Sequence, residues 1–220
     1  MKEKIERIKD KLNRLKKLDK NFDAFGSQKH QYKLNRTKSE QELIDFEKTH
    51  SISLPIEYRG FLKNIGNGGA GPYYGLEPLE NGRFADLDYM RENELIDLSR
   101  PFPHTEHWNL DLGELTENNE EEYAKNEEEY FDEKWINGLL RVANFGCGVY
   151  LNLVVNGSEF GNLWVDDRCN DQGIYPDPYS EKEDRIQFLD WYELWLDKEL
   201  KERKAGNKTN LWSKLKSMWS

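Results

Sequence analysis

The stretch GLLRVANFGCGVYLNLVVNGSEFGNLWVDD, residues 138–167, constrains the fold more than any other part of the chain. It contains three apolar segments, separated by turns at Gly146-Cys147-Gly148 and Asn156-Gly157. Apolar and other residues alternate within the first two segments, and Leu163-Trp164-Val165 forms the third. Alternation interrupted by glycine turns is typical of strands joined as hairpins. The stretch therefore predicts an antiparallel meander.

Two helices are expected before this meander. Ser39-Glu40-Gln41-Glu42 is a capping box, in which the serine and Glu42 can each accept a hydrogen bond from the other's backbone N–H. A second helix should begin near Pro55, which suits a first turn because proline has no N–H to leave unpaired. Its apolar stripe has helical spacing: Tyr58, Phe61, Leu62 and Ile65.

A cluster of glycines follows this second helix, at Gly66, Gly68, Gly69, Gly71 and Gly75. We expect Gly66 to cap the helix in the left-handed conformation. Phosphate-binding glycine loops precede a helix N-terminus, where free N–H groups and the positive dipole end face the anion. Here carbonyl groups and the negative dipole end would face the loop, so the cluster predicts a helix stop and a turn.

The order of elements indicates the fold class. Residues 76–113 contain short apolar stretches and prolines, which predict loop with one or two strands or turns. After the meander, Phe188, Leu189, Tyr192, Trp195 and Leu196 have helical spacing. We therefore predict an α+β fold, with a mainly antiparallel sheet, leading N-terminal helices and a closing C-terminal helix. The sequence predicts three divisions: a basic helical extension (1–35), the main domain (36–200) and a basic amphipathic tail helix (201–220).

Both ends of the chain carry an apolar stripe among basic residues. Near the N-terminus the stripe is Ile5, Ile8, Leu12 and Leu15. Two heptads are too few for a coiled coil, so this helix should pack onto the domain or form a frayed extension. Near the C-terminus, Trp212 and Trp219 lie beside lysines, so that helix either docks on the acidic domain or lies on an anionic membrane surface. The two terminal helices could pack within one chain or between two chains, so the sequence leaves the oligomeric state open.

The charge is distributed unevenly. The chain carries −10, but residues 1–20 and 201–220 each carry +5, so residues 21–200 carry −20. Residues 114–133 hold ten acidic side chains and one lysine, in a segment that could be a helix or a long solvated loop. A domain this acidic repels nucleic acid and attracts basic proteins, although charge runs are also common on solvated faces.

No combination of residues predicts catalysis or a cofactor. His104 and His107 form only half of a metal site, and the DDRCNDQG run lacks the ligand spacing of a calcium loop. Asp166 and Asp167, adjacent on a strand end, should point to opposite sides. The chain has two cysteines, which predict reduced thiols. It has no apolar run of about 20 residues and no signal-peptide pattern, so we expect a cytoplasmic protein. We expect no enzyme, no metal and no cofactor.

Short motifs follow one another in the first half of the chain: Phe46-Glu47, Leu54-Pro55, Tyr58, Phe61-Leu62 and Asn67-Gly68-Gly69. Together they resemble the opening of the SUKH superfamily, the Smi/Knr-type domain. The later glycine turn and the Phe188-Leu189 helix fit this resemblance, which covers roughly residues 36–200. The basic N-terminal helix, the long acidic segment and the lysine-tryptophan tail depart from a minimal member.

The resemblance implies an α+β fold without a catalytic constellation. Bacterial members act mostly as immunity proteins that bind and neutralise toxins, many of them nucleases or deaminases. Fungal members regulate cell-wall assembly. The expected function is therefore neutralisation of a toxin with a basic, nucleic-acid-handling surface, without direct nucleic acid binding by this chain. The alternative is a regulatory scaffold in cell-wall or signalling control. A metal-dependent hydrolase would rest only on scattered acids and the two histidines.

The charge and the aromatic residues suggest which side chains would bind such a partner. The acidic candidates lie in two groups: Glu120, Glu121, Glu122, Glu127, Glu128 and Glu129, and then Asp166, Asp167 and Asp171. Aromatic residues often dominate interface energies, so Tyr73, Tyr74 and Trp164 are added as possible anchors. For Trp164 core packing competes with this interpretation, because its strand must bury one face.

Overall fold

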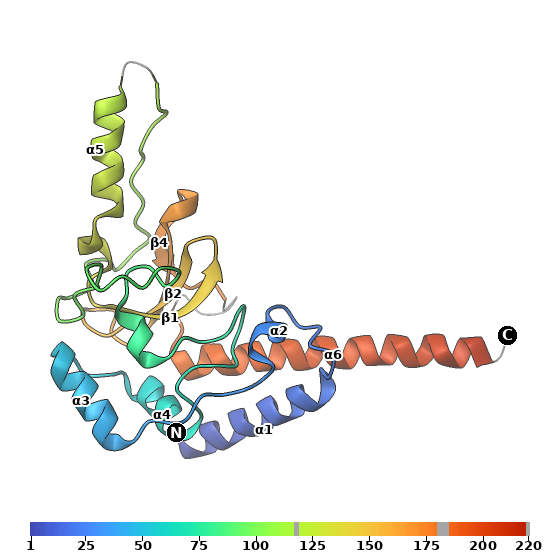
Figure 1. The fold of residues 1–220 in the computed structure, drawn as a ribbon. Coiled ribbons are helices and arrows are strands. Elements are labelled where there is room, and N and C mark those ends of the chain that lie inside the picture. Colours follow the sequence, from blue (N-terminus) through green and yellow to red (C-terminus); the bar gives the residue numbers. More distant parts are fainter. Residues whose placement is uncertain (117–118, 180–184, 219–220) are drawn as a thin grey trace.

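The structure is a computed structural model that describes residues 1–116, 119–179 and 185–218, with side chains described as far as Ala205 in the last helix (Figure 1). Its sheet has four strands: β1 Leu139–Gly146, β2 Val149–Val154, β3 Leu163–Asp167 and β4 Gly173–Pro176. They lie in the order β1-β2-β3-β4, and each neighbouring pair is antiparallel. The α+β fold and the three-stranded meander are confirmed.

The fourth strand was not predicted. It has four residues, begins at Gly173 and ends at Pro176, so it contains no period that a sequence pattern could detect. Its place comes from pairing with β3, where Val165 lies opposite Tyr175. On its other edge, Ile174 forms an isolated bridge with Trp108. β4 therefore depends on tertiary contacts.

Both faces of the sheet are covered, so burial along the strands does not alternate. All four residues Leu163–Asp166 of β3 are buried, as are Leu139–Ala143 of β1. On one face the Trp164 ring packs edge-to-face on Phe102, with centroids 4.9 Å apart. The segment 76–113 covers this face, and it does so with a short 3-10 helix, η1 Leu79–Arg83, and isolated bridges. Of the predicted strands or turns in this segment, the structure forms turns and isolated bridges.

The two leading helices are α3 Glu40–His50 and α4 Ile56–Asn64. The capping box is confirmed: the Glu42 backbone N–H donates to Ser39 Oγ over 3.2 Å, and the Ser39 N–H donates to Glu42 Oε2 over 2.8 Å. Pro55 directly precedes α4, and the stripe Tyr58, Phe61, Leu62 is buried. A short α2, Ser27–His30, lies in the segment whose sequence has no period.

Gly66 does not have the conformation that its position predicted. The residue after α4 is Ile65, with φ −113°, and Gly66 is not among the residues with positive φ. A Cβ at Gly66 would lie 3.0 Å from both Leu34 Cβ and Asn35 O, so glycine permits a close approach of two segments here. The positive φ angles lie further on, at Gly68, Gly69 and Gly75, where the chain turns. The cluster is a helix stop and a turn.

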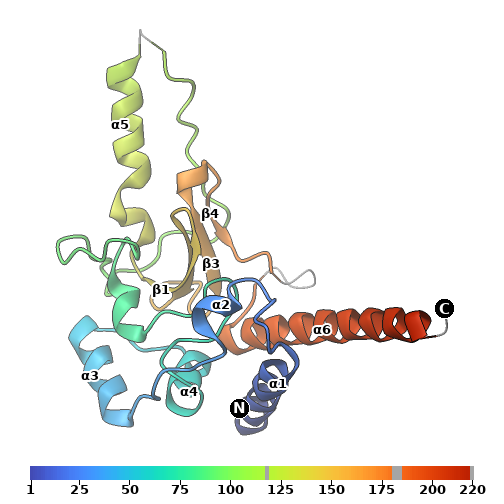
Figure 2. The ribbon, with the colours of Figure 1, turned by 45° about the vertical axis from the view of Figure 1, so that its right-hand side comes forward.

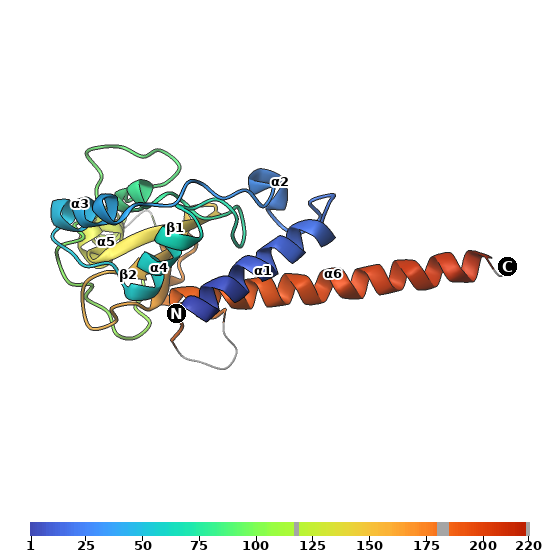
Figure 3. The same ribbon diagram turned by 90° about the horizontal axis from the view of Figure 1, so that it is seen from below.

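The N-terminal helix α1, Lys2–Leu18, packs along the closing helix α6, Phe188–Met218 (Figure 3). Ile8 and Leu15 are fully buried. Ion pairs support the contact, since Lys4 Nζ lies 2.7 Å from Asp190 Oδ1 and Lys11 Nζ lies 2.7 Å from Asp197 Oδ1. Packing onto the domain, rather than a frayed extension, is thus the observed arrangement.

The closing helix is longer than predicted. α6 continues without a break to Met218, and its C-terminal half extends away from the rest of the molecule (Figures 1 and 3). The segment predicted as a separate tail helix is therefore the end of α6, and its backbone extends from the domain instead of docking on it. Gly206 is the one glycine in this helix, no proline interrupts it, and one glycine costs a helix only about 1 kcal/mol. The side chains of the predicted tail stripe, including Trp212, lie outside the described residues.

Candidate partner-binding surfaces

The acidic segment contains a helix, α5 Glu120–Phe131, followed by the short η2 Glu133–Ile136. We call residues 120–131 the acidic arm, because the helix projects from the sheet in both views (Figures 1 and 2). All six predicted glutamates are exposed: Glu120, Glu121, Glu122, Glu127, Glu128 and Glu129. Within the described ranges, only Glu129 has a cation at ion-pair distance, Lys134 Nζ at 2.6 Å. The arm thus presents a row of carboxylates to solvent.

The arm is fixed to the domain at its C-terminal end. Tyr130 is fully buried, its ring stacks on Trp108 with centroids 5.5 Å apart, and its hydroxyl donates to Asn109 Oδ1 over 2.7 Å. The Tyr130 carbonyl accepts a 3.0 Å hydrogen bond from the Arg168 guanidinium. These contacts hold the helix base, so the carboxylates keep a defined position relative to the sheet.

Asp171 belongs to the same surface. It lies after the short helix η3, Arg168–Asn170, and is exposed. Together with Tyr123 of the arm it lines a pocket of about 410 Å³, whose other side is the loop around Asp111. The structure therefore places Asp171 next to Tyr123 of the arm, although the two residues are about 50 positions apart in the sequence.

Two predicted contact residues are in the interior instead. Trp164 is fully buried, in agreement with the core-packing alternative, and Asp166 is only 4% exposed. The Asp166 carboxylate lies 3.0 Å from an Arg141 nitrogen and 2.8 Å from Arg168 Nε. Burial alone would raise the pKa of Asp166, but the two arginines outweigh it and hold the pKa below its ordinary value. Asp166 is thus the anion of a buried ion cluster.

Asp167 points to the other side, as predicted from strand alternation. With Tyr73 it lines a separate cavity of about 420 Å³, which we call the aromatic cavity. Tyr73 stacks on Phe145 at 3.7 Å, and the Tyr175 hydroxyl donates to Asp167 Oδ2 over 3.1 Å. The full lining is Tyr73, Phe145, Val149, Val165, Asp167, Tyr175, Asp177, Pro178, Tyr179 and Lys198.

Asp177 and Lys198 are the charged residues of this cavity that the sequence did not single out. Asp177 is 4% exposed, and its Oδ1 accepts a hydrogen bond from the Tyr179 N–H over 2.8 Å. Burial raises the pKa of Asp177 to about 6, against the opposing effects of that hydrogen bond and of Lys198. Lys198 Nζ lies 3.9 Å from the Tyr179 ring centroid and donates to its carbonyl. In the sequence, the Tyr-Pro-Asp-Pro-Tyr run of residues 175–179 could have pointed to this cavity.

An exposed aromatic surface adjoins the cavity. Tyr74, the last predicted anchor, is 39% exposed, and Phe25 is 64% exposed. The Phe25 ring lies 5.4 Å from that of Tyr74 and 6.2 Å from that of Tyr73. Since Tyr73 also lines the cavity, exposed aromatic rings continue from the surface to its wall.

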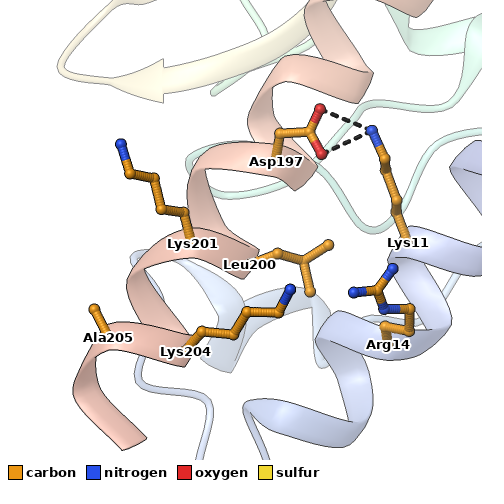
Figure 4. Close-up of a pocket in the computed structure, with 7 residues that line it drawn as sticks. All are labelled: Lys11, Arg14, Asp197, Leu200, Lys201, Lys204 and Ala205. Atoms are coloured by element: carbon orange, nitrogen blue, oxygen red, sulfur yellow. Dashed lines mark hydrogen bonds and ion pairs between the residues drawn. The ribbon is translucent and has the colours of Figure 1, made fainter. Parts of the chain in front are cut away.

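A groove between α1 and α6 has the opposite charge. It encloses about 560 Å³ and is lined by Lys11, Arg14, Asp197, Leu200, Lys201, Lys204 and Ala205 (Figure 4). Figure 4 shows Lys11 paired with Asp197. Arg14, Lys201 and Lys204 line it without a carboxylate of the described residues at ion-pair distance. The basic charge thus lies along α1 and α6, away from the acidic arm.

The histidines and cysteines are not arranged as a reactive centre. His104 is buried, and its ring centroid lies 5.1 Å from that of Trp108 and 5.6 Å from that of Trp135. His107 is exposed and contacts the Gln172 carbonyl. Cys147 and Cys169 are free thiols. In the part of the chain that the structure describes, no three His, Cys, Asp or Glu side chains are placed to hold a metal ion. None of the described helices combines the length and apolar character needed to cross a membrane.

These features define a class of protein: an α+β domain with a four-stranded antiparallel meander and flanking helices, which carries an exposed acidic helix and an aromatic cavity. The SMI1/KNR4 family model (SUKH-1) matches residues 38–194, and the chain belongs to this family. The match leaves out α1 and the projecting part of α6. The family is generally non-catalytic. No curated protein and no solved structure matches the chain.

Proposed function

We propose that this protein is an immunity protein that neutralises a toxin by covering the toxin's basic, nucleic-acid-handling face with the acidic arm. Members of the family are often immunity proteins, which supports the general role. In this proposal the protein performs no chemistry, and it acts in the cytoplasm, where such a toxin would meet nucleic acid.

The observation that carries the proposal is the row of exposed carboxylates on α5. Five of the six glutamates have no cation at ion-pair distance among the described residues, so their charge is not neutralised within the molecule. A surface that binds nucleic acid is basic and groove-like, because it must neutralise phosphates. A helix of fixed carboxylates that projects from the domain can enter such a groove. Opposite potentials also speed the encounter of the two proteins.

The test is a pull-down from a lysate of the native strain at low and high salt, with mass spectrometry of the retained proteins. We expect one dominant basic partner, which is released as salt rises because exposed charges are screened. The comparison is an arm variant with Glu120, Glu121, Glu122, Glu127 and Glu128 changed to Gln, which should lose this partner. A matched control changes five exposed acidic residues elsewhere: Glu3, Glu6, Asp10, Asp23 and Asp45.

Equal retention by the arm variant and the wild type would refute the role of the arm. Many substoichiometric partners would contradict one-to-one neutralisation and favour the scaffold alternative. Once the partner is identified, co-expression supplies the functional assay. The wild type and the control variant should protect cells that express the toxin, and the arm variant should not.

A further inference from the structure

The aromatic cavity has the composition of a site for an organic cation. Three tyrosine rings and Phe145 line it, and the carboxylates of Asp167 and Asp177 are part of the same wall. Aromatic faces attract cations through their negative quadrupole, and carboxylates add direct charge attraction. Its volume of about 420 Å³ leaves room for the end of a long side chain.

The chain's own lysine shows how a cation contacts this lining. Lys198 Nζ lies 3.9 Å from the centroid of the Tyr179 ring, within the distance range of cation–π contacts. It also donates a 3.1 Å hydrogen bond to the Tyr179 carbonyl. Within the described ranges it has no ion pair with either carboxylate of the cavity. One ammonium therefore faces two carboxylates, and the lining keeps one negative charge in excess.

Asp177 provides the second, independent observation. It is 4% exposed, and no described cation lies within ion-pair distance of it. A buried carboxylate without a paired cation destabilises the folded state, whereas asparagine would keep the hydrogen bond from Tyr179 without the charge. Residues that reduce stability in this way are characteristic of functional sites. A cationic ligand would supply the missing partner.

From this geometry we propose that the aromatic cavity receives one arginine or lysine side chain of the protein partner, between the tyrosine rings and the carboxylates of Asp167 and Asp177. The inference rests on the proposed function in that the partner is a basic protein. The exposed rings of Phe25 and Tyr74 extend the same surface, so a protein that inserts a basic side chain would also cover them. Arginine fits best, because its guanidinium is planar and stacks on aromatic faces.

The site can be tested without the partner. The full chain is titrated with Nα-acetyl-arginine amide and Nα-acetyl-lysine amide, and the ring resonances of Tyr73, Tyr175 and Tyr179 are followed by NMR. We expect saturable shifts at millimolar ligand, with about tenfold weaker binding in Asp177→Asn. Lys198→Met removes the competing ammonium and should tighten binding. Nα-acetyl-citrulline amide, nearly the same shape without the charge, should bind at least tenfold more weakly than the arginine compound.

Equal binding of citrulline and arginine, no shifts with either cation, or no effect of Asp177→Asn would each overturn the proposal. The arm variant is the matched control, because its changes lie outside the cavity and should leave the titration unchanged. Once the partner is purified, the cavity proposal and the proposed function can be tested separately. If Asp177→Asn binds the partner as the wild type does while the arm variant does not, the cavity proposal fails and the proposed function stands.

Discussion

Asp166 and Asp177 are both buried carboxylates, yet their surroundings give them opposite properties. Arg141 and Arg168 contact Asp166, so its charged form is stabilised in the folded protein. Asp177 has the Tyr179 N–H as its hydrogen-bond donor and Lys198 as the nearby cation, so burial dominates and its charged form is disfavoured. At the scale of single residues, the Asp166 carboxylate stabilises the fold and the Asp177 carboxylate destabilises it.

Asp177→Asn should stabilise the protein at neutral pH. The pKa of Asp177 is raised to about 6, above the ordinary value of 3.8, so the group favours folding only while it is protonated. That contribution is complete below about pH 4 and is lost as the pH rises through 6. Asparagine resembles the protonated form at every pH. We expect a gain of roughly 1–3 kcal/mol in the free energy of unfolding at pH 7, and almost none at pH 4.

Urea unfolding of both proteins at pH 4, 5, 6 and 7 measures this difference. The same charged groups surround position 177 in each, namely Lys198 and Asp167, with Tyr73, Tyr175 and Tyr179. A gain that is independent of pH, or a loss at pH 7, would contradict the assignment of a strained carboxylate.

Asp166→Ala should have the opposite effect, since it leaves two buried arginines without their anion. Removing one member of a buried ion pair typically costs about 3–5 kcal/mol in the free energy of unfolding. Chemical denaturation at pH 7 measures the loss. Asp171→Asn is the control on the same segment, because Asp171 is exposed and asparagine also tolerates its left-handed conformation, so stability should change by about 0.5 kcal/mol or less. Similar values for the two variants would mean that the cluster does not stabilise the fold.

Among the elements, the pair α1 and α6 shows how the basic N-terminus becomes part of the domain. The apolar stripe of α1 is buried against the rest of the protein, and its cations meet acids of α6. Arg7 and Lys11 both contact Glu193, and the hydrogen bonds with Arg7 and then Lys11 lower the pKa of Glu193 to about 2. The helix is thus an integral layer, although the family match begins only at residue 38.

Leu15→Ala tests this contact. Leu15 is fully buried on α1, and truncating a buried leucine typically costs about 2–5 kcal/mol, through lost transfer free energy and a cavity. Leu18→Ala, at the half-exposed end of the same helix, should cost less, about 1 kcal/mol, because Leu18 is 36% exposed. Thermal or urea unfolding measures both. If Leu15→Ala is as stable as the wild type, α1 does not contribute to the cooperative core.

At the scale of the whole molecule, charge is separated in space. The acidic arm projects from the sheet, and the basic groove lies along α1 and α6, which extend in another direction (Figures 1 and 2). A partner with a basic face is therefore attracted toward the arm and repelled from the groove. In the proposed function, this separation would orient the encounter as well as accelerate it.

The association rate with the partner should therefore depend on salt through the arm. We expect the wild-type rate to fall roughly tenfold or more between 50 and 500 mM salt, because the Debye length shortens from about 14 to about 4 Å. The rate of the arm variant should vary much less. Stopped-flow measurements with the purified partner test this. If the association rates of the wild type and the arm variant depend equally on salt, the charges that steer association lie outside the arm.

The sequence determined the local elements: the meander, the capped helix α3, helix α4 and the turn after it, and the stripe of α1. These follow from the spacing of apolar residues and from turn chemistry, which act over a few residues. The acidity of residues 114–133 was also evident from the sequence, and it led to most of the candidate site.

Only the tertiary structure decided what depends on contacts between distant segments. It placed Asp166 in the core, joined Asp171 to the arm and brought Tyr73, Asp167, Asp177 and Lys198 around one cavity. It also formed β4, gave Gly66 a packing role, and continued α6 away from the domain. The physical reason is that burial and pairing are set by the neighbours a residue meets in space, and the pattern along the chain does not specify those neighbours.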